Sequence, residues 1–312
     1  LAFADEMMTM ESGYKNVITE VTKANYMYAI NSSRLAKKAE SSDELTAFQQ
    51  KAAAQKENDR IKQNIYVNGY ASPDGPEKFN DKLSAARSES GKKAAEKLLK
   101  EVGLPLDAAS YGEDWEGFKE LVAASDIEDK ELILSVLNSY ESSSERENQI
   151  KNMSQVFAAL KEEILPQLRR AQLVNSSDIT GKTDDEMAAL VRAGKFSELD
   201  DKEMLHIAST GKLTQEEKIA VLEAAAKEYK SAAAYNNLGV AYAEAGQGAK
   251  AAEAFAQAVK AGGNASQINN NLALVNLMKG DTASAKKYVG GASKEAKALA
   301  AAAEGNYAQA QS

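Results

Sequence analysis

The sequence predicts an α+β two-layer sandwich followed by an all-α helical array. Strand-like and helix-like segments alternate up to about residue 178, which favours helices packed on one sheet. After residue 186 the patterns are helical throughout, and glycines break them at regular intervals. All four prolines lie at or before Pro166, so the organisation changes along the chain.

Four strands are expected in the first part, at residues 25–31, 64–70, 108–111 and 169–175, and the first of them is rich in aromatic and β-branched residues. Helices are expected between them. The first has Leu45, Phe48 and Ala52 on one face and begins at a capping box of Ser41 and Glu44. The second has Leu83, Ala86, Ser90, Ala94 and Leu98 at helical spacing. The third has Ile150, Met153, Phe157, Leu160 and Ile164 at the same spacing.

A cluster of Ser, Asp, Thr and Gly at residues 175–185 marks a linker. We therefore divide the chain into an α/β domain at 20–178 and a helical domain at 186–312. Residues 1–19 form a separate N-terminal segment, or the end of a region that lies upstream.

Composition excludes several classes of function. The chain has 38 basic and 46 acidic residues, a net charge of −8, and offers no clustered basic surface for nucleic acid. It has no cysteine and a single histidine, His206, so we expect no catalytic triad, no zinc site and no other cofactor. We expect His206 to be structural. No nucleophile–base pair appears at recognisable spacing, and we predict no enzymatic activity. No apolar run is long enough to cross a bilayer, and no signal peptide is expected because acidic residues interrupt the opening segment.

The segment from the second strand into the following helix resembles the OmpA-like C-terminal domain. That family has a strand running into Gly-His-Thr-Asp-x-x-Gly, then a helix with Tyr-Asn-x-x-Leu-Ser-x-x-Arg-Ala. Seven positions coincide in spacing: Gly69, Gly75, Phe79, Asn80, Leu83, Ser84 and Arg87. The late stretch 168–172 is similar to the family's closing strand, so the resemblance covers roughly residues 20–178.

The resemblance implies a non-enzymatic domain in the periplasm, associated with the outer membrane, that binds the stem peptide of peptidoglycan. It implies Arg87 as the residue for the ligand's carboxylate, since an Arg fork matches a carboxylate. Ser72 stands where the family has the Asp that holds the ligand's ammonium group. Asp74 or Ser72 is then the candidate for this group, and Asn80 is an auxiliary hydrogen-bonding residue.

The stretch 232–265 is similar to a tetratricopeptide (TPR) repeat, with Leu238, Gly239, Tyr242, Gly246 and Phe255 at the expected positions. A second copy follows about 34 residues later. Such arrays present a concave surface to a partner's peptide or helix. The candidate partner-binding residues are Asn236, Asn237, Val240, Asn269 and Asn270. The two Asn pairs would clamp a peptide backbone through bidentate amides.

Together these interpretations predict a cell-envelope scaffold protein. The α/β domain would bind the peptidoglycan stem peptide, and the helical array would bind a protein partner. The alternative is an outer-membrane assembly adaptor whose OmpA-like domain has lost its ligand and serves only protein–protein interaction. A blocked cleft between Ser72 and Arg87 would favour this alternative.

Overall fold

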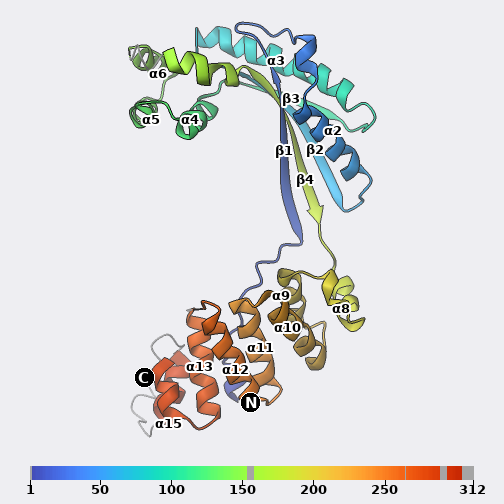
Figure 1. Cartoon of the computed structure of the whole chain (residues 1–312), viewed down its shortest axis with the longest axis vertical. Coiled ribbons are helices and arrows are strands. Elements are labelled where there is room, and N and C mark those ends of the chain that lie inside the picture. Colours follow the sequence, from blue (N-terminus) through green and yellow to red (C-terminus); the bar gives the residue numbers. More distant parts are fainter. Residues whose placement is uncertain (1, 153–157, 264, 289–293, 304–312) are drawn as a thin grey trace. The chain divides into compact units, whose positions relative to one another are not determined.

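The computed structural model of the chain describes residues 2–152, 158–263, 265–288 and 294–303 (Figure 1). It divides into two compact units. The α/β unit is Val17–Thr180, close to the predicted 20–178. The helical unit combines Gly181–Ser312 with Leu1–Asn16, so the N-terminal segment belongs to the helices that end the chain.

The α/β unit contains a four-stranded mixed sheet. Its strands are β1 (Val17–Met27), β2 (Ile61–Ala71), β3 (Leu106–Glu113) and β4 (Arg170–Thr180), in the order β1-β4-β2-β3. β2 and β3 are parallel, and β4 is antiparallel to both of its neighbours. Each strand overlaps its predicted segment, but β1 begins eight residues earlier than the predicted 25–31. In the early part of β1 the half-buried positions are Glu20 and Thr22 while Val21 is exposed, so apolar residues do not mark the inward face there.

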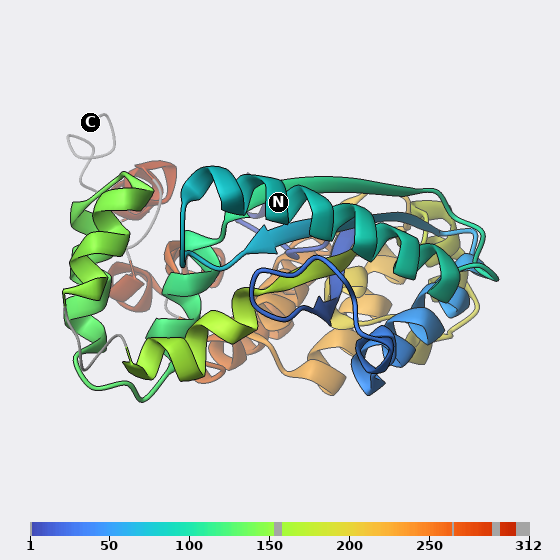
Figure 2. The ribbon, with the colours of Figure 1, turned by 90° about the horizontal axis from the view of Figure 1, so that it is seen from above.

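Two long helices pack against this sheet, α2 (Asp43–Lys56) and α3 (Glu77–Leu98), and α3 lies along β2 (Figure 2). Leu45, Phe48 and Ala52 are buried as predicted, although the N-cap of α2 is Ser42 and not Ser41. The buried face of α3 also differs from the prediction. Leu83 is buried, but the other predicted positions are exposed or half-buried. The helix instead turns these residues inward: Asn80, Ser84, Arg87, Ser88, Gly91 and Ala95.

Glycines explain this orientation of α3. A Cβ at Gly69 of β2 would lie 2.1 Å from the carbonyl oxygen of Ser84, and one at Gly91 would lie 2.5 Å from the Cβ of Ala171 in β4. The helix therefore approaches the sheet too closely for larger residues at these points. Close approach at two glycines, more than burial of large apolar residues, decides which face of α3 meets the sheet.

The region between β3 and β4 is helical, as predicted. It holds α4 (Trp115–Ala124), α5 (Lys130–Ser139), α6 (Ser143–Lys151), a short π-helical turn η2 (Leu160–Ile164) and a 3₁₀ turn η3 (Leu165–Leu168). Elsewhere in this unit, a 3₁₀ turn η1 (Lys37–Glu40) precedes α2. Ile150, Leu160 and Ile164 are buried in one apolar cluster, together with Trp115 and Phe118. Of the other residues predicted for this face, Met153 and Phe157 lie outside the described residues.

The helical unit is a series of short helices. These are α1 (Ala2–Asp5), α8 (Asp184–Arg192), η4 (Phe196–Glu198), α9 (Asp201–Ser209), α10 (Gln215–Tyr229), α11 (Ala232–Glu244), α12 (Gly248–Lys260), α13 (Ser266–Met278), α14 (Thr282–Tyr288) and α15 (Lys294–Ala303). Capping boxes at Thr183, Asp200 and Thr214 begin α8, α9 and α10. Gly239 of α11 lies under Phe255 of α12, and Gly246 makes the turn between them with a φ of +76°.

The chain passes between the two units at two adjacent points. Val17 pairs with Thr180 at the start of the β1–β4 ladder. One residue further, the Gly181 amide donates to the Asn16 carbonyl at 2.7 Å. Strand pairing therefore places the end of the N-terminal segment, Asn16, next to Gly181, where the helical part of the chain begins. No helix among the residues that the structure describes is long and apolar enough to span a membrane.

Candidate functional site

Four asparagines on α11 and α13 contact the main chain of the N-terminal segment. They are Asn236, Asn237, Asn270 and Asn271, and their exposed fractions are 0, 6, 0 and 0%. Their partners are main-chain atoms of residues 6–10. We call these four side chains the asparagine clamp. Buried amides need hydrogen-bond partners, and the segment supplies them.

Two of the four bind one residue each through both ends of the amide. The Oδ1 atom of Asn271 accepts from the Met8 amide at 2.7 Å, and its Nδ2 atom donates to the Met8 carbonyl at 2.6 Å. Asn237 binds Met10 in the same way: its Oδ1 atom accepts from the Met10 amide at 2.8 Å, and its Nδ2 atom donates to the Met10 carbonyl at 3.0 Å. Each side chain thus satisfies the donor and the acceptor of one extended residue, as a neighbouring β-strand would.

The other two asparagines extend the pattern toward the N-terminus. Asn236 Nδ2 donates to the Met8 carbonyl at 3.0 Å, and Asn270 Nδ2 donates to the Glu6 carbonyl at 3.1 Å. The amides also bond to one another, including Asn271 Nδ2 to Asn236 Oδ1 at 2.8 Å. The result is a connected ladder in which each pair of asparagines advances the segment by two residues.

Apolar side chains of the segment complete the contact. Ala4 and Met7 are buried in the same cluster as Phe255, Ile268 and Leu272. Met8, whose amide and carbonyl are both clamped, is 38% exposed. Phe3 and Met10 are partly buried against the same cluster, so the segment is bound by its main chain and by its apolar side chains.

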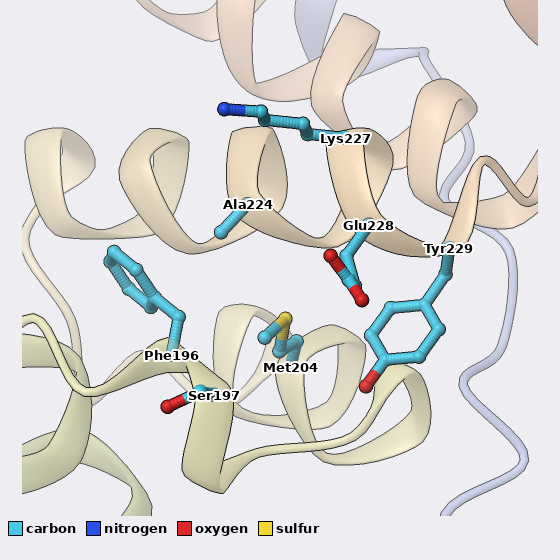
Figure 3. A pocket seen from close by; sticks show the side chains of 7 residues that line it. All are labelled: Phe196, Ser197, Met204, Ala224, Lys227, Glu228 and Tyr229. Carbon is cyan, nitrogen blue, oxygen red and sulfur yellow. The ribbon is translucent and has the colours of Figure 1, made fainter.

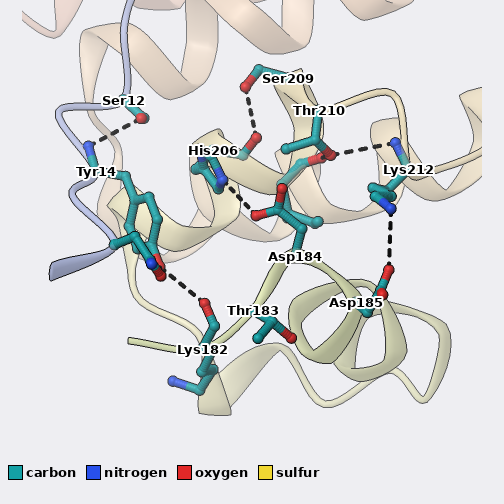
Figure 4. A network of polar contacts seen from close by, with 12 residues as sticks. Ser12, Tyr14, Lys182, Thr183, Asp184, Asp185, His206, Ser209, Thr210 and Lys212 are labelled. Carbon is teal, nitrogen blue, oxygen red and sulfur yellow. Dashed lines mark hydrogen bonds and ion pairs between the residues drawn. The ribbon is translucent and has the colours of Figure 1, made fainter. Parts of the chain in front are cut away.

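A second set of contacts holds the segment further along, against α8 and α9 (Figure 4). The Tyr14 ring stacks on His206 with centroids 4.4 Å apart, and its hydroxyl donates to the Lys182 carbonyl at 3.1 Å. His206 Nε2 lies 2.7 Å from Asp184 Oδ1. The single histidine of the chain thus packs against the N-terminal segment.

The sequence named Asn236, Asn237, Val240, Asn269 and Asn270 as partner-binding residues. The structure places Asn236, Asn237 and Asn270 in the clamp, and Asn271 there in place of Asn269. Asn269 is half-buried and makes none of the six bonds to the segment, and Val240 belongs to the apolar core beneath it. Asn270 and Asn271 lie 34 residues after Asn236 and Asn237, so the four stand at equivalent positions of a 34-residue spacing, and partner binding by these residues stays a prediction.

Arg87, the candidate for a ligand carboxylate in the α/β unit, is completely buried. Its Nε, Nη1 and Nη2 atoms donate to the carbonyls of Ser32, Tyr70 and Ala29 at 2.9, 3.0 and 3.1 Å. Burial lowers the pKa of the guanidinium to about 10. In this geometry Arg87 ties the end of β2 to the loop after β1 and presents no exposed donor to a ligand.

Ser72 and Asp74 lie together at the end of β2. The Ser72 hydroxyl is buried and donates to Asp74 Oδ1, and the Asp74 amide donates back to the Ser72 carbonyl at 2.8 Å. Asp74 Oδ2 lies 3.4 Å from Arg169 Nη2, with the two side chains 17% and 15% exposed. Sequence reasoning placed Arg169 in the closing strand but missed it as a site residue. Its proximity to Asp74 arises only when the sheet forms.

Asn80, the auxiliary candidate, is buried at the first turn of α3. Its Nδ2 atom donates to Glu113 Oε1 at 3.0 Å, and the indole of Trp115 donates to the other oxygen of Glu113 at 3.1 Å. Burial raises the pKa of Glu113. Asn80 therefore braces the ends of β3 and α3 in this structure.

A hollow of about 340 Å³ in the helical unit lies between η4, α9 and α10 (Figure 3). Its lining residues are Phe196, Ser197, Met204, Ala224, Lys227, Glu228 and Tyr229. The described residues hold no cluster of His, Cys, Asp or Glu able to bind a metal ion. Comparison with protein-family models and with the curated proteins finds no match for this chain.

Proposed function

We propose that this chain is a non-enzymatic scaffold of the cell envelope whose helical unit binds extended polypeptide by its main chain. The asparagine clamp carries this proposal. It makes six hydrogen bonds to main-chain atoms of residues 6–10 and uses buried amides on two helices to do so. Within the chain it fastens the N-terminal segment, and the same surface suits a partner's extended segment.

Main-chain recognition supports a binding role because it is tolerant of sequence. An extended peptide offers one donor and one acceptor per residue, and strand addition uses the same groups. Each such bond contributes about 0.5–1.5 kcal/mol net, so a ladder of several bonds gives useful affinity. Specificity then comes from the buried positions that Ala4 and Met7 occupy.

The envelope location rests on the resemblance to OmpA-like and TPR proteins and remains part of the proposal. Arg87 and Ser72 are buried and use their polar groups in hydrogen bonds within the chain, which leaves neither exposed for a stem peptide. This favours the adaptor alternative, in which the OmpA-like domain serves protein–protein interaction. The partner contacts are then centred on the helical unit.

Peptide titration of a full-length variant tests the proposal. Met8→Pro/Met10→Pro removes two clamped N–H groups, so the chain's own segment should leave the clamp. A synthetic peptide of residues 1–14 should bind this variant in isothermal titration calorimetry and should not bind wild type, whose clamp is occupied. Met8→Ala/Met10→Ala keeps both N–H groups and is the matched control. Failure of the peptide to bind the folded proline variant contradicts the proposal.

A second candidate function is supported by the Asp74–Arg169 pair. A zwitterionic amino-acid end needs an anion and a cation a few Å apart, and this pair offers them at the edge of the α/β unit. We propose it as the place where a peptidoglycan stem peptide would bind, with Arg169 in the role first considered for Arg87. A diaminopimelate-containing stem peptide should then bind wild type about tenfold more tightly than Arg169→Gln or Asp74→Asn. Absence of binding by wild type at millimolar peptide contradicts this second function and leaves the adaptor.

A further inference from the structure

We infer that the asparagine clamp is a site of segment exchange, in which the N-terminal segment of a second copy of this chain replaces the chain's own. This inference rests on the proposed function, because it assumes that the clamp holds extended polypeptide reversibly. It names one partner for that surface, a second copy that contributes residues 4–10. The resulting assembly is a dimer, or a longer chain of copies.

The contacts favour no particular copy. All six hydrogen bonds join the clamp to main-chain atoms of the segment, and its buried side chains, Ala4 and Met7, enter an apolar cluster. The same segment from a second copy makes the same contacts with the same energies. The difference between the closed and the exchanged forms is therefore the entropy of the connection and any strain in it.

The connection between the segment and the α/β unit is a short tether at residues 11–16. Glu11, Gly13, Lys15 and Asn16 are exposed, and Gly13 has a φ of +70°. A Cβ at Gly13 would meet only the Lys202 side chain, at 3.8 Å, so the tether is not packed into the helices there. Tyr14 makes the main contact of the tether, through His206 and Lys182. Release of the Tyr14 contacts would free residues 11–15, while the Gly181 amide still holds the Asn16 carbonyl.

The order of synthesis also favours exchange. Asn236 follows Met8 by 228 residues, and Asn271 follows it by 263. The segment is made before its clamp, with the whole α/β unit between them. Since chains fold from the N-terminus during synthesis, the segment waits unbound while the α/β unit forms. During this interval it is available to the clamp of another copy.

Competition from the chain's own segment sets the conditions for exchange. The β1–β4 ladder holds Asn16 beside Gly181, which keeps the segment near its own clamp. Tethered ligands of this kind act at an effective concentration of about millimolar. Wild type at micromolar concentration should therefore be mostly monomeric, and exchange should dominate when a chain's own segment cannot dock.

Two complementary full-length variants test the inference. The acceptor, Met8→Pro/Met10→Pro, has an intact clamp and a segment that cannot fill it. The donor, Asn237→Asp/Asn271→Asp, has an intact segment and a clamp that repels main-chain carbonyls. Each variant alone should be monomeric in size-exclusion chromatography with light scattering. An equimolar mixture at micromolar concentration should form a one-to-one heterodimer.

Controls separate exchange from other causes of association. A donor that also carries Met8→Pro/Met10→Pro should not form the heterodimer, because it has no competent segment. Circular dichroism checks that each variant keeps its helices, and Met7→Asp replaces the proline acceptor if that variant unfolds. If the peptide of residues 1–14 binds the acceptor but the donor chain does not, exchange is overturned and the proposed function stands. If neither binds, both are overturned.

Discussion

Asn271 shows how one side chain can hold an extended residue from both sides. Its amide bonds to the N–H and the carbonyl of Met8 and to the side chain of Asn236, with no exposed surface. Removing such a residue leaves several buried groups without partners. That penalty exceeds the net worth of the bonds themselves, because burial prevents water from replacing them.

We expect Asn271→Ala to lower the free energy of unfolding of the helical unit by about 1–3 kcal/mol. Asn269→Ala on the same helix is the control. It should change stability by less than about 0.5 kcal/mol, because Asn269 makes none of the clamp bonds. Urea denaturation followed by circular dichroism measures both. Equal effects of the two substitutions would show that the clamp adds nothing.

Arg87 allows a similar test in the α/β unit. Its guanidinium is buried and donates to three main-chain carbonyls. Arg87→Met should cost about 3–5 kcal/mol of stability, as removal of one member of a buried polar network does. Arg34→Met, at a surface position of the same loop, should be close to neutral. A stable Arg87→Met that loses only ligand binding would instead support a direct ligand role for Arg87.

At the scale of elements, α11 and α12 pack closely because the contact includes a glycine. A Cβ at Gly239 would lie 2.5 Å from the Phe255 ring, whereas one at Gly248 would meet nothing within 4 Å. The two glycines therefore have different reasons to be present. At Gly239 the packing demands a small residue, and at Gly248 the helix would accept a side chain.

Alanine substitutions should separate these two cases. Gly239→Ala should destabilise the helical unit by about 1–3 kcal/mol through overpacking against Phe255. Gly248→Ala should be neutral or stabilising by about 0.4–1 kcal/mol, because alanine restricts the unfolded chain. Thermal denaturation of the two variants compares them directly. Destabilisation by Gly248→Ala and not by Gly239→Ala would contradict this account of the helix pair.

At the scale of the whole molecule, the helical unit is built from both ends of the chain, with the α/β unit inserted between them. Its N-terminal segment supplies main-chain partners for four buried asparagines. The helical unit is therefore incomplete without residues that lie before the α/β unit in the sequence.

Met8→Pro/Met10→Pro should accordingly speed amide hydrogen exchange in α11 and α13 and leave exchange in the β2–β4 ladder unchanged. The proline rings remove two clamped donors within the helical unit, whereas the β2–β4 ladder belongs to the other unit. Mass spectrometry of proteolytic fragments resolves the two units. Thr9→Ala, at an exposed position of the same segment, should leave both units as in wild type.

Local chemistry was enough to predict strands and helices in the first part of the chain and helices alone after it. Gly239, Phe255 and Gly246 marked the packing and turn of α11 and α12, because repeat spacing encodes contacts close in sequence. The same spacing relates Asn236 and Asn237 to Asn270 and Asn271, which contact the chain's own segment, whereas Asn269 and Asn270 were named for a partner's peptide, and that binding stays a prediction. The OmpA-like resemblance drew attention to Arg87, and it could not show that main-chain carbonyls surround this residue.

Tertiary structure alone decided what fills the clamp and where the charges of the α/β unit meet. Met8 and Asn271 are 263 residues apart, and no periodic pattern connects two ends of a chain. The β1–β4 ladder places the end of the segment, Asn16, beside Gly181 at the start of the helical part. In the first half of β1 the inward positions are polar, so the sequence does not reveal this pairing. Likewise, Asp74 and Arg169 become neighbours only when β2 and β4 pair. Residue spacing predicts contacts between residues close in sequence, whereas contacts between distant segments depend on the whole fold.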